Sequence, residues 1–133
     1  MTPSPPVAPT PATRIIKAAD LAAAFTTGGS FIETPEYRVG VARREGPGDA
    51  EVHDVDTDIF YVIDGAAVLV TGGEMVEPRT VGPNEVRAGS TAGGEAQTVT
   101  KGDMIVIPRT VPHWFNEVPR APFVYLVIKS TTR

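Results

Sequence analysis

From Glu36 onward the sequence is a succession of short β-branched or aromatic runs separated by glycine and proline, and no other feature constrains the fold as strongly. The runs read YRVGVARR, AEVH, DIFYVI, AAVLVT, EVRAGS, QTVT, MIVIP, HWFNEV and FVYLVIKST. Runs of this length and composition are typical of β-strands. Between them, Asp64-Gly65, Gly72-Gly73 and Lys101-Gly102-Asp103 supply residues that accept the positive φ of tight turns. Many short strands divided in this way predict an all-β sandwich or barrel.

The segment before these runs has a different character. Five of the first 11 residues are proline, which lacks a backbone donor, so residues 1–13 are predicted to be a disordered, proline-rich leader to a single domain spanning residues 14–133. The segment RIIKAADLAAAF places Ile15, Leu21 and Phe25 at helical spacing, and the glycines of TTGG follow as a stop signal. One short N-terminal helix is therefore predicted.

A polar segment rich in proline and glycine, residues 73–94, interrupts the strand pattern and contains one predicted strand. Loops of this length on a compact barrel are often functional, and a flexible insertion is the alternative.

Composition excludes several classes of function. The 133 residues contain no cysteine, so disulfides, thiolate metal sites and cysteine nucleophiles are absent. A net charge of −4 argues against partners such as nucleic acid or an anionic membrane, which require a concentrated basic face. No signal-peptide pattern or apolar run of ~20 residues is present, so a soluble, cytoplasmic protein is expected.

The chemistry-bearing residues gather around the only two histidines. His53 follows Glu51 with one residue between them, so both side chains point to the same face of a strand. His113 lies in IPRTVPHWF, at the start of another predicted strand. Two neutral imidazoles and a carboxylate facing one cavity form a facial site for a divalent transition metal. A cation there would also offset the repulsion among the acidic residues Glu51, Asp54, Asp56 and Asp58. The alternatives are two structural histidines and a solvated acidic strand end.

Both histidine segments resemble the conserved motifs of the cupin superfamily, most closely small single-domain bacterial cupins. In GDMIVIPRTVPHWFN, the motif positions are occupied by Gly102, Pro108, His113 and Asn116, with Thr110 where glycine is usual. In the first motif, Glu51 stands at the first histidine position, His53 at the second, Asp58 at the glutamate position and Gly65 at the closing glycine. The resemblance covers roughly residues 36 to 129.

The resemblance implies a double-stranded β-helix, or jelly-roll, barrel with a metal in its mouth. The implied ligands are Glu51, His53, Asp58 and His113. The side chain of Asp58 is one methylene shorter than that of the usual glutamate. Asp58 therefore either binds the metal directly, binds it through water, orients His53 or stays outside the site. The implied ion is Fe, Mn, Ni or Zn. The catalytic residues would be Glu51, His53 and His113, with Glu51 as general base if it is not a ligand.

The expected function is a metal-dependent enzyme that acts on a small organic molecule inside the barrel by cyclisation, isomerisation, dehydration or oxygenation, and a natural-product tailoring step would fit. A non-catalytic cupin that binds or senses a small ligand is the alternative, because one motif histidine is missing. A homodimer is expected from the apolar strands PFVYLVIKSTT and EYRVGVARR, which would be exposed as edges on a lone barrel. Other candidates are aromatic residues at the barrel mouth (Phe60, Tyr61, Trp114, Phe115, Tyr125) and arginines for an anionic substrate group (Arg38, Arg87, Arg109).

Overall fold

The computed structural model describes residues 12–132, so most of the predicted leader lies outside the described residues. One helix and eleven strands occupy this part of the chain. The helix is α1 (Ala18–Ala24), and the strands are β1 (Gly29–Glu33), β2 (Tyr37–Arg44), β3 (Ala50–His53), β4 (Asp56–Thr71), β5 (Glu74–Val76), β6 (Arg79–Gly82), β7 (Glu85–Ala88), β8 (Ser90–Ala92), β9 (Glu95–Thr100), β10 (Met104–Ile107) and β11 (His113–Thr131). The predictions of an all-β jelly-roll barrel and of one short N-terminal helix are confirmed.

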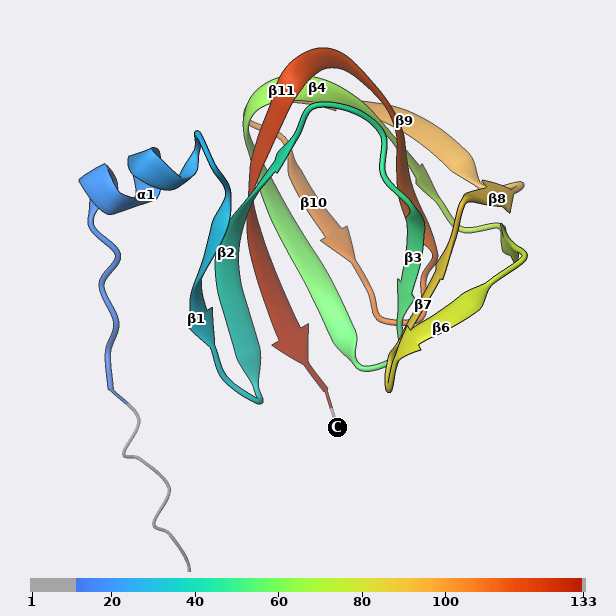
Figure 1. The fold of residues 1–133 in the computed structure, drawn as a ribbon, viewed down its shortest axis with the longest axis horizontal. Coiled ribbons are helices and arrows are strands. Elements are labelled where there is room, and N and C mark those ends of the chain that lie inside the picture. Colours follow the sequence, from blue (N-terminus) through green and yellow to red (C-terminus); the bar gives the residue numbers. More distant parts are fainter. Residues whose placement is uncertain (1–11, 133) are drawn as a thin grey trace, which may run out of the picture.

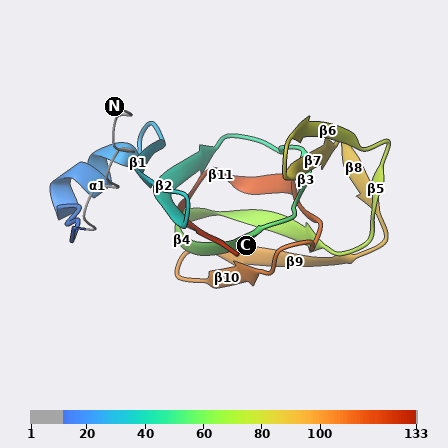
Figure 2. The same cartoon turned by 90° about the horizontal axis from the view of Figure 1, so that it is seen from below.

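Two long strands, β4 and β11, form the backbone of the barrel. They pair antiparallel along most of their length, from His113 opposite Thr71 to Thr131 opposite Asp56. On its other side β11 pairs first with β3 and then with β2, while β4 pairs with β9 and β10. The sheet curls around its own concave face (Figure 1), and β9 and β10 lie across the opening from β3, β7 and β6 (Figure 2).

The continuity of β4 corrects the sequence prediction of two strands separated by a turn at Asp64-Gly65. The strand does not reverse there: Gly65 has φ of 83° and lies inside β4. A Cβ at this position would lie 2.2 Å from the carbonyl oxygen of Pro122 and 2.6 Å from that of Arg120. The close approach of β11 therefore requires glycine at position 65. The two strands predicted within β11 are likewise one continuous strand.

The segment of residues 73–94 is likewise more regular than predicted. It contains four short strands, β5 to β8, where the sequence predicts one. β7 pairs with β3, so that Glu85 lies opposite His53 and Arg87 opposite Glu51. The segment therefore brings charged side chains to the histidines instead of forming a flexible insertion.

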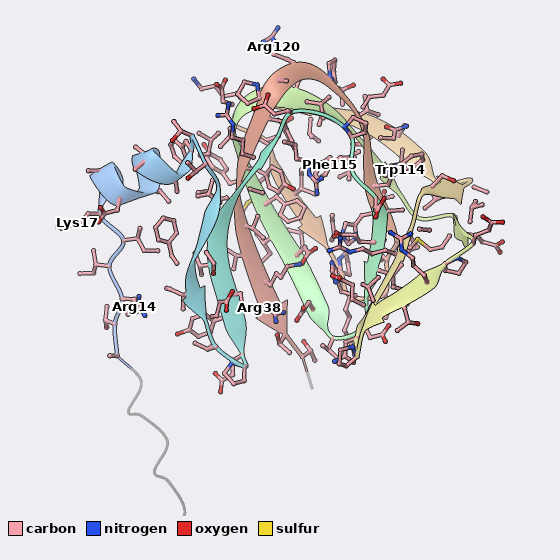
Figure 3. All side chains as sticks on the ribbon, in the orientation of Figure 1. Arg14, Lys17, Arg38, Trp114, Phe115 and Arg120 are labelled. Carbon is pink, nitrogen blue, oxygen red and sulfur yellow. The ribbon has the colours of Figure 1, made fainter. Side chains whose placement is uncertain are left out.

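The core fills the concave face of the barrel with aromatic and branched side chains. Phe123 and Val62 are fully buried, and Phe60, Phe115 and Tyr125 pack around them. The Phe115 ring points into the barrel interior (Figure 3). Full burial of one such side chain contributes about 1.5–3 kcal/mol, so this cluster is the main source of stability.

Helix α1 packs on the outside of the barrel. Ala24 is buried against Val41 and Val124, with Leu21 and Phe25 beside them. The helix ends where the backbone N–H of Gly28, at φ of 72°, donates to the carbonyl oxygen of Ala24 at 2.7 Å. No helix in residues 12–132 is long and apolar enough to cross a membrane.

The strands that motivated the predicted homodimer are not edges. β2 pairs with β1 and β11, and β11 pairs on both sides. In the described part of the chain, the edge strands of the large sheet are β1, β6, β9 and β10, and β5 and β8 form a separate two-stranded sheet. Of these, β10 exposes the large apolar side chains of Met104 and Val106.

Candidate metal centre

Three strands bring the candidate ligands to one place. β3 supplies Glu51 and His53, β11 supplies His113 from its first residue, and β4 supplies Asp58. The pairing of β11 with β3 places His113 directly opposite Glu51. His53 and His113 are each 5% exposed, Asp58 is 1% exposed and Glu51 is half-buried. The structure thus brings together all four residues singled out by the motif resemblance, from segments about sixty residues apart in the sequence.

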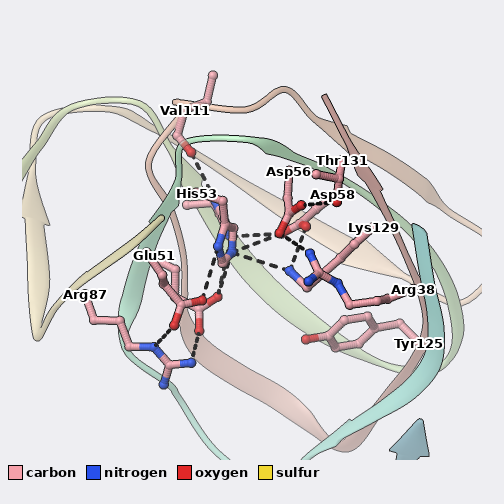
Figure 4. A network of polar contacts seen from close by, with 12 residues as sticks. Arg38, Glu51, His53, Asp56, Asp58, Arg87, Val111, Tyr125, Lys129 and Thr131 are labelled. Carbon is pink, nitrogen blue, oxygen red and sulfur yellow. Dashed lines mark hydrogen bonds and ion pairs between the residues drawn. The ribbon is translucent and has the colours of Figure 1, made fainter. Parts of the chain in front are cut away.

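The Nε2 atoms of the two histidines lie near the same two carboxylates, Glu51 and Asp58, which Figure 4 shows beside His53. Glu51 Oε2 lies 3.4 Å from His53 Nε2 and 3.6 Å from His113 Nε2. Asp58 Oδ2 lies 3.5 Å from His53 Nε2 and 3.3 Å from His113 Nε2. Ligand atoms of Glu51, His53 and His113 all lie within 4.8 Å of one another, so these three could hold one ion.

The remaining nitrogen of each ring fixes its orientation. His113 Nδ1 lies 3.1 Å from the carbonyl oxygen of Val111, and His53 Nδ1 lies 3.1 Å from Glu85 Oε1. Both partners only accept hydrogen bonds, so in the neutral rings the proton is on Nδ1 and the Nε2 lone pair faces the carboxylates. Metal-binding histidines are oriented in the same way by a carbonyl or a carboxylate.

The residues present fit a divalent ion on two further grounds. His113 Nε2 and Asp58 Oδ2 are buried and have no hydrogen-bond partner by normal geometry, although such atoms are normally satisfied. Bonds of ~2.0–2.2 Å separate neighbouring ligands by roughly 3.0–3.5 Å, close to the distances from Glu51 to the histidines. Two imidazoles with a carboxylate suit Fe, Mn, Ni or Zn. The ligand roles themselves stay predictions.

The charges of the site shift the pKa values of its members in opposite directions. Burial would raise the pKa of Glu51, but the nearby imidazoles of His113 and His53 and the charge of Arg87 outweigh it and hold that pKa well below its usual range. The pKa of Asp58 is also lowered: burial would raise it, but His113 and Lys129 outweigh that effect. Burial would lower the pKa of His113, but Asp58 and Glu51 raise it to about 9. Without a metal, His113 is therefore protonated at neutral pH.

Protein cations also contact the acidic run. Lys129 Nζ donates to Asp58 Oδ1 at 2.8 Å, Arg87 lies 3.2 Å from Glu51 Oε1, and Arg38 pairs with Asp56. Asp54 is exposed and forms no ion pair with any described residue. The four carboxylates therefore do not converge as the sequence suggested. Glu51 and Asp58 reach the histidines, and each has a basic partner on its far side.

A cavity of about 160 Å³ lies next to the histidines inside the barrel. Its walls include the predicted aromatics Phe60, Phe115 and Tyr125 together with Glu51, Asp58, His113 and Lys129. Tyr61 is 43% exposed on the outer face, and Trp114 hydrogen-bonds to the carbonyl oxygen of Gly48. Arg109 is exposed. Arg44, which sequence reasoning did not single out, also lines the cavity.

Residues 45–133 match the family model for cupins. The chain belongs to the cupin family. Solved structures support the same fold. A protein from Neisseria meningitidis aligns over 89% of this chain and 100% of its own, with a TM-score of 0.59 and 14% identity.

Two further solved structures share the fold. Hydroquinone 1,2-dioxygenase PnpCD, solved with Cd²⁺ and 4-hydroxybenzonitrile, aligns over 76% of this chain and 61% of its own (TM-score 0.53, 18% identity). KdgF from Halomonas sp. aligns over 80% of this chain and 78% of its own (TM-score 0.52, 15% identity). At these identities the likeness shows the fold alone. No curated protein matches the sequence.

Within this cupin, the loop before His113 departs from the usual motif at Thr110. Thr110 has φ of 73°, a left-handed conformation that is costly for a β-branched residue and easy for glycine. Its backbone N–H donates to the carbonyl oxygen of His53 at 2.7 Å, which ties the loop to β3. The conformation explains why glycine is usual here, and the hydrogen bond shows how the loop holds the two histidines together.

Proposed function

We propose that this cupin is a metal-dependent enzyme that acts on a small organic molecule bound in the barrel cavity. The observation that carries the proposal is the pair of buried histidines whose Nε2 atoms face Glu51 and Asp58 at the wall of a 160 Å³ cavity. Perturbed titratable groups beside a cavity are typical of active sites. The proposed ligands are Glu51, His53 and His113.

A bound divalent ion would supply Lewis-acid polarisation of a substrate oxygen or, as iron, dioxygen chemistry. The protein groups have separate tasks. Glu85 and the Val111 carbonyl hold the imidazoles in the required tautomer. Phe60, Phe115 and Tyr125 exclude water and pack against the substrate. Asp58, an ionised carboxylate whose Oδ2 has no hydrogen-bond partner, would accept a proton from the substrate during isomerisation, dehydration or cyclisation.

A non-catalytic cupin that binds or senses a small ligand is the second candidate. It is favoured by Lys129 and Arg87, because they neutralise Asp58 and Glu51 without an ion. In that case the cavity would hold a ligand, and no bond would change.

Elemental analysis after chelation and reloading tests the first step. About one divalent ion per chain is expected in the wild type and none in a His53→Ala, His113→Ala double variant. Stoichiometric metal in the folded double variant would refute the proposed centre.

A second experiment separates the two candidates. Metal-loaded wild type and His113→Ala are incubated with a fractionated small-molecule extract, and the mixture is followed by mass spectrometry. Consumption of one compound with appearance of a product, in the wild type only, supports the enzyme. Retention of one compound without change supports the binding protein.

A further inference from the structure

Two consecutive arginines at the end of β2 lie in different surroundings. Arg43 faces the end of helix α1, where it donates to the carbonyl oxygen of Phe25 at 3.1 Å, and it also pairs with Glu45, just after β2, at 2.9 Å. Arg44 turns to the opposite face of the strand and lines the barrel cavity together with Glu51 and His113. The second arginine therefore places a permanent positive charge inside the barrel.

The guanidinium of Arg44 is held in place by groups that leave most of its donors free. Nε donates to the Tyr125 hydroxyl at 3.0 Å, and Cζ lies 5.3 Å from the centre of the Phe115 ring. A Cβ on Gly48 would lie only 2.3 Å from Nη1, so the absence of a side chain there makes room for the guanidinium. Among the described residues, Arg44 forms no ion pair, and Nη1 and Nη2 have no hydrogen-bond partner. These terminal N–H groups therefore remain available to a ligand.

Tyr125 adds a second donor beside the guanidinium. Its ring is 3% exposed, and burial raises the pKa of the phenol, so the hydroxyl stays neutral at physiological pH. The oxygen accepts the hydrogen bond from Arg44, which leaves the O–H proton for another acceptor. No acceptor for it occurs among the described residues. Guanidinium and phenol donors at one wall match the two oxygens of a carboxylate.

The charges around the cavity also favour an anion at Arg44. Each carboxylate of the cavity wall already has a basic partner: Lys129 lies 2.8 Å from Asp58, Arg87 lies 3.2 Å from Glu51 and Arg79 lies 2.7 Å from Asp49. The guanidinium of Arg44 has no such partner among the described residues, so its charge is left for a ligand carboxylate.

The cavity volume limits the size of such a molecule. At about 160 Å³ it is about half the ~300 Å³ at which sites for drug-sized ligands usually begin, so a small molecule is expected.

We propose that Arg44 and Tyr125 form the carboxylate anchor of this cavity, so that its substrate class is a small monocarboxylate whose apolar body lies against Phe60 and Phe115. This inference rests on the proposed function in one respect, because it takes the cavity to be the substrate site. It adds the chemical class of the substrate and its orientation, with the carboxylate at Arg44 and the remainder directed toward the histidines.

Binding of propionate and benzoate, with propionamide and benzamide as uncharged probes, tests the anchor. Titrations use calorimetry and the fluorescence of Trp114, whose Nε1 donates to the Gly48 carbonyl oxygen at 2.8 Å beside the Arg44 guanidinium. They are run on Zn²⁺-loaded and chelated protein, with metal content measured on the same samples.

The matched variants are Arg44→Gln and Arg43→Gln, neighbours on opposite faces of one strand. We expect at least one carboxylate to bind the wild type and Arg43→Gln equally, and Arg44→Gln about tenfold to a hundredfold more weakly, as for loss of a hydrogen bond to a charged group. The amides should bind all three proteins weakly and alike. Tyr125→Phe keeps the ring but removes one donor, and it should weaken carboxylate binding about threefold to tenfold.

Equal carboxylate affinity in the wild type and Arg44→Gln would overturn the inference, as would the absence of carboxylate binding to the wild type. Should Arg44→Gln fail to fold, an unchanged affinity in Tyr125→Phe would do the same. Carboxylate binding that depends on Arg44, in protein that takes up no metal, would support the anchor and refute the proposed metal centre. Full metal loading together with carboxylate binding that does not depend on Arg44 would support the metal centre and refute the anchor.

Discussion

The buried ion pair between Asp58 and Lys129 provides the most direct test of how this site is stabilised. The two residues lie opposite each other on β4 and β11, with Lys129 Nζ 2.8 Å from Asp58 Oδ1. Asp58 is 1% exposed, while the side chain of Lys129 is 25% exposed. Changing Lys129 to methionine keeps most of the side-chain volume and leaves the Asp58 carboxylate without its hydrogen-bond donor.

Removing one partner of a buried ion pair costs ~3–5 kcal/mol. We expect about 3 kcal/mol, at the low end of that range, because protonated His113 still contacts Asp58 and water reaches Lys129. Asp58→Asn combined with Lys129→Met removes both charges, so the double variant should lose less stability than the sum of the single variants, with a coupling of about 2 kcal/mol. Lys101, which is exposed and has no ion pair in the described structure, supplies the control Lys101→Met, expected within ~0.5 kcal/mol of the wild type.

The pH dependence of this effect follows from the lowered pKa of Asp58. A carboxyl whose pKa is lower in the folded protein contributes stability above its unfolded pKa, and that contribution is lost as the pH falls through the folded pKa. The difference between wild type and Lys129→Met should therefore be full at pH 7 and shrink below about pH 4.

Urea unfolding of chelated protein, followed by Trp114 fluorescence, measures these free energies. Lys129→Met and Lys101→Met with the same midpoint would refute the reasoning, because Asp58 would then be stabilised by its other neighbours alone. A coupling energy near zero in the double-mutant cycle would refute it as well.

Three further predictions concern the ligands and the loop, and a fourth concerns assembly. Glu51→Gln should weaken metal binding without unfolding the protein, while Glu51→His should restore or tighten it; a metal titration in which Glu51→Gln equals the wild type would contradict this. Because the pKa of His113 is about 9, an ion must displace its proton, so metal affinity should rise ~tenfold per pH unit from pH 7 to 9, and a flat profile by competition titration would contradict it. Thr110→Gly should stabilise the protein by about 1 kcal/mol in urea, since it removes left-handed strain, and a loss of stability would argue against that strain. The expected homodimer should use the exposed β10 edge, so Met104→Lys should lower the mass measured by light scattering, and a monomeric wild type would contradict the dimer.

Local sequence patterns were sufficient to predict most strands, because alternation and turn residues are local properties. β2 and β3 begin and end where the runs YRVGVARR and AEVH do. The continuity of β4 and β11 is not predictable from the sequence, because glycine is equally compatible with a turn and with a bent strand. In the structure, the close approach of Pro122 to Gly65 shows that the strand is bent, and these two residues are distant in the sequence.

The candidate site shows the same division. Glu51, His53 and His113 were predicted from spacing and from the motif resemblance, because strand parity fixes which side chains share a face. Glu85 and Arg87 were not predicted, since they reach the site only through the pairing of β7 with β3. Arg44 was missed for a related reason: in the sequence it is equivalent to Arg43, and only the sheet register shows which of the two faces the cavity.

The contacts that build the pocket join residues far apart in the chain: 71 residues separate Asp58 from Lys129, and 81 separate Arg44 from Tyr125. Such contacts form late in folding, because closing a long loop costs entropy before the contact repays it. An ion therefore has no assembled pocket to bind in the folding transition state. Interactions absent from that state act on the unfolding rate. Metal loading should thus prolong the lifetime of the folded protein while leaving the speed of folding nearly unchanged.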